Sequence, residues 1–208
     1  MAKKSKKAKK ADKGKKKKNS EAAEALGEMT PALEIAVAEI EVNNHPLLLR
    51  GRDISAREQS FSHPWNPKSE LIGVRLGHEL GLKRVGVSIA RMPPGKESYV
   101  PHAHHREEEW LYILSGEGVA IIGDEAVRVR AGDFLAFPAP QEAHHLKNAG
   151  EADLVYLMGG ESAKMDVVDF PTLGKRTVRL GDRVTVYDMA SGQDMAMPKP
   201  KKKNKKKR

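Results

Sequence analysis

Short apolar runs separated by turn-forming residues dominate the chain from residue 85 to residue 187. Clusters of Gly, Pro, Asn or Asp stand between the runs, and the pair Gly123 and Asp124 is typical of a hairpin turn. Strands interrupted by turns about every 8 to 12 residues indicate an all-β sandwich or barrel. We therefore predict an all-β domain with strands at Val85–Ala90, Trp110–Leu114, Val119–Ile122, Ala126–Val129, Phe134–Phe137, Asp153–Met158 and Arg183–Tyr187.

The basic residues of this 208-residue chain are concentrated at its two ends. Residues 3–18 contain 11 Lys and one Asp, and residues 199–208 contain seven Lys and one Arg, whereas the whole chain has a net charge of only +9. The part between these ends is therefore acidic, which disfavours a nucleic-acid-binding domain with a basic face. We predict disordered Lys-rich tails at 1–20 and 191–208, a linker with a short helix or strand at 21–44, and a folded domain with an N-terminal lead-in at 45–190.

The chain contains no cysteine and no apolar segment of the about 20 residues that span a bilayer. The lack of cysteine excludes a disulfide scaffold, a zinc site built on thiolates and a cysteine nucleophile. The basic N-terminus is followed by Glu21, Glu24 and Glu28 rather than by an apolar segment, so we do not expect a signal peptide. We expect a cytoplasmic protein without a membrane partner.

The Lys-rich tails allow three interpretations. They keep the chain soluble, they lie on the acidic domain, or they contact the phosphates of RNA or DNA without sequence specificity. Neither tail contains an aromatic residue, so stacking on nucleic-acid bases is not expected there. Nucleic acid therefore stays a candidate non-specific partner of the tails.

Five of the eight histidines fall in two clusters, at residues 102–105 and 144–145. His102 and His104 are two residues apart, so on a strand their side chains lie on the same face. Glu109 begins the next apolar run and can face the same interior, and His144 begins another strand-like segment that can face it from across a barrel. We predict that these four side chains converge on one point.

Three imidazoles and one carboxylate form a ligand set for one divalent transition-metal ion. The set suits Fe, Mn, Zn, Ni or Cu, and affinity alone does not choose among them. If the ion takes six ligands, coordination positions stay open for a small-molecule ligand or substrate, oxygen or water. Two neighbouring residues, His145 and Glu108, remain alternatives to His144 and Glu109 as ligands.

The spacing of these residues resembles the two motifs of the cupin superfamily. The first motif consists, in chain order, of a Gly, the pair His-x-His, a Glu and a second Gly. The second motif consists of a Gly, a Pro, a His and an Asn. The motifs fall within about residues 85–160, and the chain at about 45–190 is similar to uncharacterised bacterial single-domain cupins. The matching residues are Gly95, His102, His104, Glu109 and Gly116 in the first motif, and Gly132, Pro138, His144 and Asn148 in the second.

The resemblance implies a double-stranded β-helix, or jelly-roll barrel, that often forms a homodimer. Its metal ligands would be His102, His104, Glu109 and His144. It implies a metal-dependent enzyme that acts on a small polar molecule, and it leaves dioxygenase, isomerase and decarboxylase chemistry open. The alternatives are a non-catalytic module that binds a small ligand while its tails contact polyanions, and a scaffold that keeps the site without using it.

Side chains beside the motifs receive separate predictions. We expect Glu107 and Glu108 to be solvated surface charges, because glutamate is rarely buried. We expect Phe134, Phe137, Tyr156 and Met158 to line the core or a pocket. A ligating histidine usually donates its second ring N–H to a carboxylate or a carbonyl, but the sequence does not indicate which group accepts it.

Overall fold

The computed structural model describes residues 45–140, 142–193 and 195. The predicted tail at 1–20 and the predicted linker at 21–44 lie outside the described residues, as does most of the tail predicted at 191–208. Antiparallel strands dominate the described part of the chain and only short helices accompany them. The structure therefore confirms the predicted all-β jelly-roll fold.

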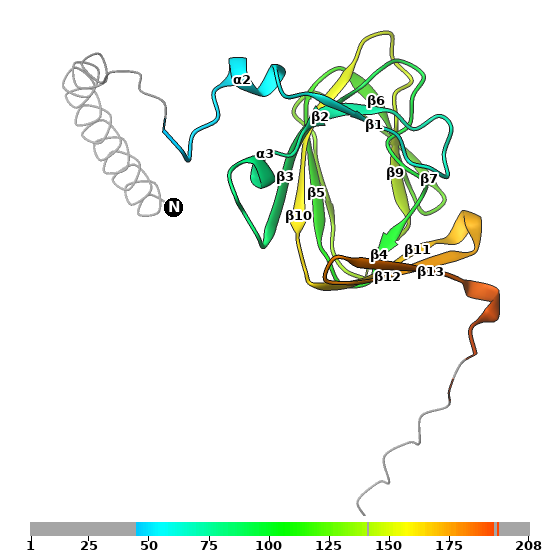
Figure 1. The fold of residues 1–208 in the computed structure, drawn as a ribbon. Coiled ribbons are helices and arrows are strands. Elements are labelled where there is room, and N and C mark those ends of the chain that lie inside the picture. Colours follow the sequence, from blue (N-terminus) through cyan, green and yellow to red (C-terminus); the bar gives the residue numbers. More distant parts are fainter. Residues whose placement is uncertain (1–44, 141, 194, 196–208) are drawn as a thin grey trace, which may run out of the picture. The chain divides into compact units, whose positions relative to one another are not determined.

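The strands of the described part form three antiparallel sheets (Figure 1). The largest sheet contains, in spatial order, β1 (Gln59–Phe61), β2 (Leu71–Val74), β3 (Val85–Met92), β10 (Leu154–Glu161), β5 (Glu109–Ser115) and β8 (Phe134–Phe137). The second sheet contains β7 (Glu125–Arg130), β6 (Glu117–Ile122) and β9 (His144–Lys147). The third sheet contains β13 (Arg183–Asp188), β12 (Lys175–Leu180), β11 (Met165–Phe170) and β4 (Ala103–His104).

The helical segments between these strands are all short. Helices α2 (Gly51–Ser55) and α3 (Leu76–Glu79) precede β3, and the 3-10 turns η1 (Pro171–Leu173) and η2 (Met189–Ser191) follow β11 and β13. Across residues 45–193, no helix has the length and apolar composition that a membrane crossing needs.

The hydrophobic core lies between the first two sheets. On β10, Leu154 and Tyr156 are 0% and 1% exposed, and on β5, Ile113 is 0% exposed. Leu154 and Tyr156 both face the core because they are two residues apart, and alternate side chains of a strand point to the same face. The second sheet completes the core with Ala120, Val129 and Leu146.

The third sheet lies across one end of the barrel, where β11, β12 and β13 are drawn in yellow to brown (Figure 1). Strand β4 joins this sheet by pairing with β11, and the pairing aligns His104 with Val168 and Ala103 with Asp169. The histidine-rich segment is therefore held against β11, a strand more than 60 residues further along the chain.

Every predicted strand overlaps a strand of the structure, and the predicted hairpin is confirmed because Ile122 pairs with Glu125 across Gly123 and Asp124. Strands β11 and β12 were not predicted, since charged side chains interrupt their apolar residues. The N-terminal lead-in, for which no strand or helix was predicted, contains α2, β1, β2 and α3.

The prediction for Phe134 is wrong, because its side chain is 61% exposed. It lies on the outer face of β8 and stacks on Trp110 of β5, with ring centroids 6.1 Å apart. Phe137 is buried as expected, because three residues further along β8 the side chain faces the interior.

Candidate metal centre

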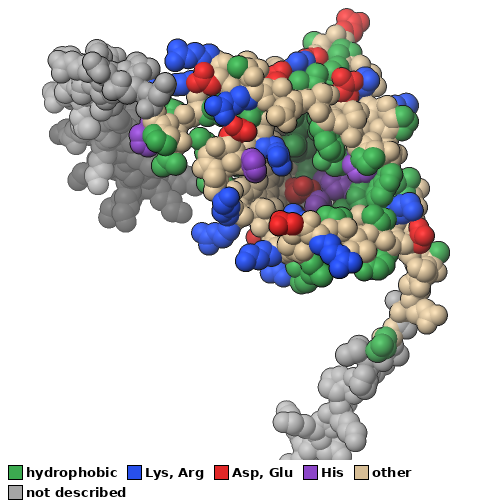
Figure 2. Space-filling view, viewed as in Figure 1, with side chains coloured by type: hydrophobic (Ala, Val, Ile, Leu, Met, Phe, Trp, Pro, Cys, Tyr) green, Lys and Arg blue, Asp and Glu red, His purple; other side chains and the backbone are tan. Residues whose placement is uncertain are grey.

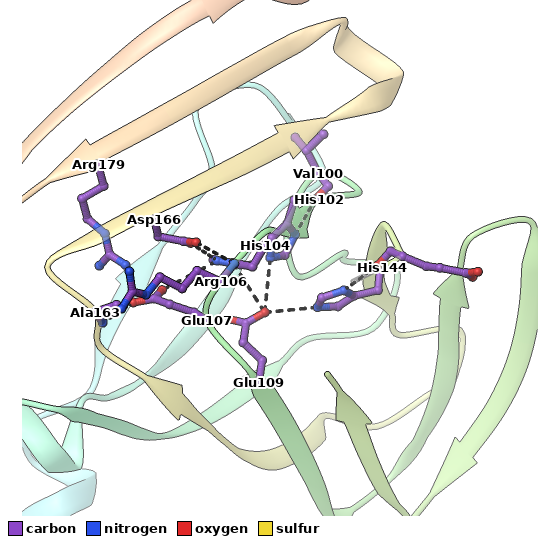
Figure 3. A network of polar contacts seen from close by, with 11 residues as sticks. Val100, His102, His104, Arg106, Glu107, Glu109, His144, Ala163, Asp166 and Arg179 are labelled. Carbon is purple, nitrogen blue, oxygen red and sulfur yellow. Dashed lines mark hydrogen bonds and ion pairs between the residues drawn. The ribbon is translucent and has the colours of Figure 1, made fainter. Parts of the chain in front are cut away.

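Three imidazole rings surround one carboxylate oxygen inside the barrel (Figure 3). The Nε2 atoms of His102, His104 and His144 lie 3.8, 3.5 and 3.3 Å from Oε2 of Glu109. The ligand atoms of His102, His104 and Glu109 all lie within 4.8 Å of one another, which is a spacing that suits a shared metal ion. The structure thus brings together the four residues that the sequence predicts to converge.

The backbone holds these residues on separate elements. His104 ends β4, Glu109 begins β5 and His144 begins β9. His102 precedes β4, and its backbone N–H and C=O exchange hydrogen bonds of 3.2 and 2.9 Å with His144. This reciprocal bridge fixes the first histidine cluster against the second.

The other ring nitrogen of each histidine contacts an acceptor. Nδ1 of His102 donates to the carbonyl of Val100 at 3.0 Å, and Nδ1 of His144 donates to the carbonyl of Glu142 at 3.2 Å. Nδ1 of His104 lies 2.5 Å from a carboxylate oxygen of Asp166. Because each acceptor keeps the proton on Nδ1, the lone pair of each Nε2 points toward Glu109, as metal ligation requires.

Burial and close contacts shift the pKa values of His102 and Glu109. Burial and the adjacent charge of His144 lower the pKa of His102 from 6.5 to about 4. Burial alone would raise the pKa of Glu109, but the three histidine rings around its carboxylate, which stabilise the ionised form whenever they carry a proton, lower it overall. A neutral imidazole and an ionised carboxylate are the forms that bind a metal ion, so neither has to lose a proton first at neutral pH.

The two alternative ligands lie elsewhere. Glu108 is exposed on the outside of the barrel, as expected. His145 is buried, and its Nε2 lies 4.0 Å from a carboxylate oxygen of Glu97 rather than beside Glu109. His105 is exposed and contacts Asp169 at 2.8 Å.

Asp166 of β11 supports the centre and was missed by the sequence analysis. It is 1% exposed, and it accepts hydrogen bonds from His104 Nδ1 and, at 3.1 Å, from the backbone N–H of Arg106. Because a ligating histidine usually donates its second ring N–H to an acceptor, the sequence indicated that such an acceptor should exist. His104 and Asp166 are 62 positions apart in the sequence, so local spacing could not indicate that Asp166 is the acceptor.

The prediction that Glu107 is a surface charge is wrong, because its side chain is 6% exposed. It accepts a hydrogen bond of 2.6 Å from the backbone N–H of Ala163 and pairs with the guanidinium of Arg179 on β12. A buried carboxylate is tolerated when an opposite charge and hydrogen-bond donors compensate it. Arg179 therefore allows Glu107 to be buried.

Glu107, Asp166 and Nδ1 of His104 form a second group of closely spaced ligand atoms. Arg179 already neutralises Glu107, and the backbone of Arg106 and the ring of His104 already donate to Asp166. Because these charges are compensated by protein groups, we interpret this group as a support for His104 and not as a second metal site.

The four converging residues line a cavity of about 370 Å³. Figure 2 shows histidine and carboxylate side chains in the depth of the hollow and hydrophobic side chains around it. Phe137 stacks on His144 with ring centroids 3.6 Å apart, and Tyr99 lies 5.5 Å from His102. A ligand in this cavity would contact both the candidate metal centre and the aromatic side chains beside it.

Comparison with known proteins identifies the family. A family model described as "Cupin domain" matches residues 88–160. A solved structure from Acidithiobacillus ferrooxidans, provisionally named a sugar phosphate isomerase, is 35% identical with a TM-score of 0.71, and the match covers 73% of this chain and 98% of that one. The chain belongs to the cupin family. The predicted resemblance is thereby confirmed.

Curated relatives of this cupin match shorter regions. An oxalate-binding protein of Thermotoga maritima is 40% identical over 67 residues, which is 32% of this chain and 54% of that protein. An uncharacterised protein of Methanocaldococcus jannaschii is 32% identical over 96 residues, which is 45% of this chain and 75% of that protein. The cupin described here thus spans about half the length of the oxalate-binding relative.

Replacing Arg179 with Met should destabilise the cupin because it leaves the Glu107 carboxylate without its cationic partner. We expect the free energy of unfolding to fall by about 2 kcal/mol, less than for a fully buried pair because Arg179 is 32% exposed. Urea unfolding followed by circular dichroism measures the change. The matched control is Lys175→Met on the same strand, whose pair with the exposed Asp188 should contribute at most about 1 kcal/mol. Equal losses in the two variants would contradict a special role for Arg179.

Proposed function

We propose that this cupin holds one divalent transition-metal ion between His102, His104, Glu109 and His144 and binds a small oxygen-bearing molecule beside it. The observation that carries the proposal is the convergence of three Nε2 atoms on one carboxylate oxygen, with each Nδ1 held by an acceptor. Four lone-pair donors in a largely buried site repel one another unless a cation or protons lie between them. The donor set therefore fits Fe, Mn, Zn, Ni or Cu.

Each group of side chains would have a separate role at such a metal centre. The three histidines and Glu109 would hold the ion, and Asp166 would hold the ring of His104 in the ligating orientation. A bound divalent ion supplies Lewis-acid polarisation of a ligand oxygen. The aromatic walls, with Phe137 against His144, would exclude water from the bound molecule.

An enzyme is the function that we favour. The relative from A. ferrooxidans is provisionally named an isomerase of sugar phosphates, and its match spans nearly all of that chain. Isomerase, dioxygenase and decarboxylase reactions all suit a metal centre that opens on a cavity. The substrate would be a small polar molecule that coordinates through its oxygens.

A non-catalytic binding module is the second candidate, and the oxalate-binding relative favours it. In that case the barrel at about residues 45–190 would retain a small carboxylate, while the Lys-rich ends contact nucleic acid or another polyanion. A homodimer in the cytoplasm is part of both proposals. Turnover of a ligand, as opposed to its stoichiometric binding, distinguishes the two candidates.

The metal content of the full-length chain tests the proposal. Protein purified without a nickel column and reconstituted with each metal should contain about one ion per chain by elemental mass spectrometry. His104→Ala should lose this ion, whereas His105→Ala should keep it, because His105 is exposed and faces Asp169. Oxalate should then raise the melting temperature only of the metal-loaded protein. A wild type without metal after reconstitution, or equal loss in both variants, would refute the proposed centre.

Asp166→Asn should weaken metal binding about 10- to 100-fold, because the amide no longer accepts the His104 proton as a charged group. A competition titration against a chromophoric chelator measures this affinity. Asp169→Asn, on the same strand, removes the carboxylate that binds Arg176 and His105, and it should leave metal affinity unchanged. An Asp166→Asn variant with wild-type affinity would show that this carboxylate does not orient His104.

A further inference from the structure

The hydroxyl group of Tyr99 is a polar group of the cavity that the candidate metal centre does not use. Tyr99 lies between β3 and β4, three residues before His102, and its side chain lines the cavity. Among the described residues, the hydrogen bond of Tyr99 is made by its backbone carbonyl and none by its hydroxyl. The hydroxyl of Tyr156 is closed off from solvent, whereas that of Tyr99 opens on the cavity. A donor in this position is available to a bound molecule.

Aromatic side chains hold the ring of Tyr99 in place. Phe61 stacks on it with ring centroids 5.4 Å apart and planes inclined by 24°. The rings of His63 and His102 lie beside it, with centroid distances of 5.1 and 5.5 Å. The backbone carbonyl of Tyr99 accepts a hydrogen bond of 2.9 Å from the side chain of Asn66. Because both the ring and the backbone are held, the hydroxyl has a defined position in the cavity.

Most of these contacts come from the N-terminal lead-in, which precedes the residues that the cupin family model matches. Phe61 ends β1, and His63 and Asn66 lie in the segment between β1 and β2. Asn66 is itself anchored, because its amide group also donates to the carboxylate of Glu97 at 3.0 Å. The lead-in therefore fixes the position of Tyr99 in the wall of the cavity.

Tyr99 stands beside two of the four candidate metal ligands. Its ring adjoins that of His102, and burial together with the nearby negative charge of Glu109 raises the pKa of Tyr99. A charge has this effect only when it lies close to the hydroxyl. Since the hydroxyl makes no hydrogen bond to Glu109, its proton is available to another acceptor beside the ligands.

We infer that Tyr99 donates a hydrogen bond to an oxygen of the molecule that the metal ion holds, and that it selects molecules with a negatively charged oxygen at that position. This inference rests on the proposed function and deepens it by naming the ligand class. The ligand is a small chelating carboxylate, in which one oxygen binds the ion and a neighbouring oxygen accepts the hydrogen bond.

The charges around the centre support this ligand class. A divalent ion beside the single carboxylate of Glu109 retains one positive charge, which attracts an anionic oxygen. A carboxylate has about four lone-pair sites, so it can bind the ion and still accept a proton donor. Hydrogen bonds to an ionised acceptor are roughly twice as strong as those between neutral groups. Tyr99 therefore contributes more to the binding of a carboxylate than to that of an alcohol.

Oxalate binding to the manganese-loaded full chain tests the inference, with isothermal calorimetry as the measurement. The variant Tyr99→Phe keeps the ring and removes only the hydroxyl. It should bind oxalate about 10- to 100-fold more weakly than the wild type, and its affinity for manganese should be unchanged. The matched control is Tyr112→Phe, since Tyr112 is 40% exposed on β5, and it should bind oxalate as the wild type does. Wild-type affinity in Tyr99→Phe, or equal losses in both variants, would overturn the inference.

A spectroscopic readout distinguishes a direct contact from a structural effect. A tyrosine hydroxyl that donates a new hydrogen bond shifts the near-ultraviolet absorption of its ring. The chain has four tyrosines, so the source of a shift can be assigned with single variants. Oxalate should shift the tyrosine absorption of the manganese-loaded wild type and of Tyr112→Phe, but not that of Tyr99→Phe. The same shift in Tyr99→Phe would show that Tyr99 is not the contact.

Two controls separate this inference from the proposed function. Without ligand, Tyr99→Phe should melt at the temperature of the wild type, because the hydroxyl bonds to no described group of the protein. A lower melting temperature together with lost manganese would reveal a structural role and overturn the inference. If the chain takes up manganese but binds no oxalate, or binds it equally in all variants, the inference fails and the metal centre stands. If the chain takes up no metal, both fail.

Discussion

The structure depends on the burial of three imidazoles and one carboxylate that face one another in the barrel. Their nearest approaches, 3.3 to 3.8 Å between Nε2 and Oε2, place lone pairs against lone pairs. This arrangement is favourable only with positive charge at its centre. The acceptors behind each ring, two carbonyls and the Asp166 carboxylate, keep the ring protons outside and so reserve the centre for a cation.

The jelly-roll fold supplies this arrangement by joining distant segments. The bridge between His102 and His144 ties the two histidine clusters together, and β11 pairs with β4 and brings Asp166 behind His104. The cost of burying Asp166 and Glu107 is offset by backbone N–H groups and by Arg179 on β12. Through Asp166 and Arg179, the third sheet therefore supports the residues that surround the candidate metal centre.

Sequence patterns predicted the features that depend on the spacing of nearby residues, namely the strands and the converging metal-ligand candidates. Alternating apolar residues located the strands of the barrel, and the His-x-His spacing with Glu109 and His144 indicated side chains that converge. Residues whose role depends on a distant partner were not predicted. Glu107 resembled a surface glutamate because Arg179 lies 72 positions away in the sequence. Phe134 and Phe137 looked alike as apolar strand residues, yet only Phe137 faces the interior.

X-ray absorption spectroscopy at the metal edge of the reconstituted full chain tests the central claim most directly. Multiple scattering from imidazole rings counts the histidine ligands of the bound ion. The structure predicts three imidazoles in the wild type, two in His144→Gln and three in His145→Gln, whose ring faces Glu97. A count of one or none in the wild type, or an unchanged count in His144→Gln, would contradict the proposed centre.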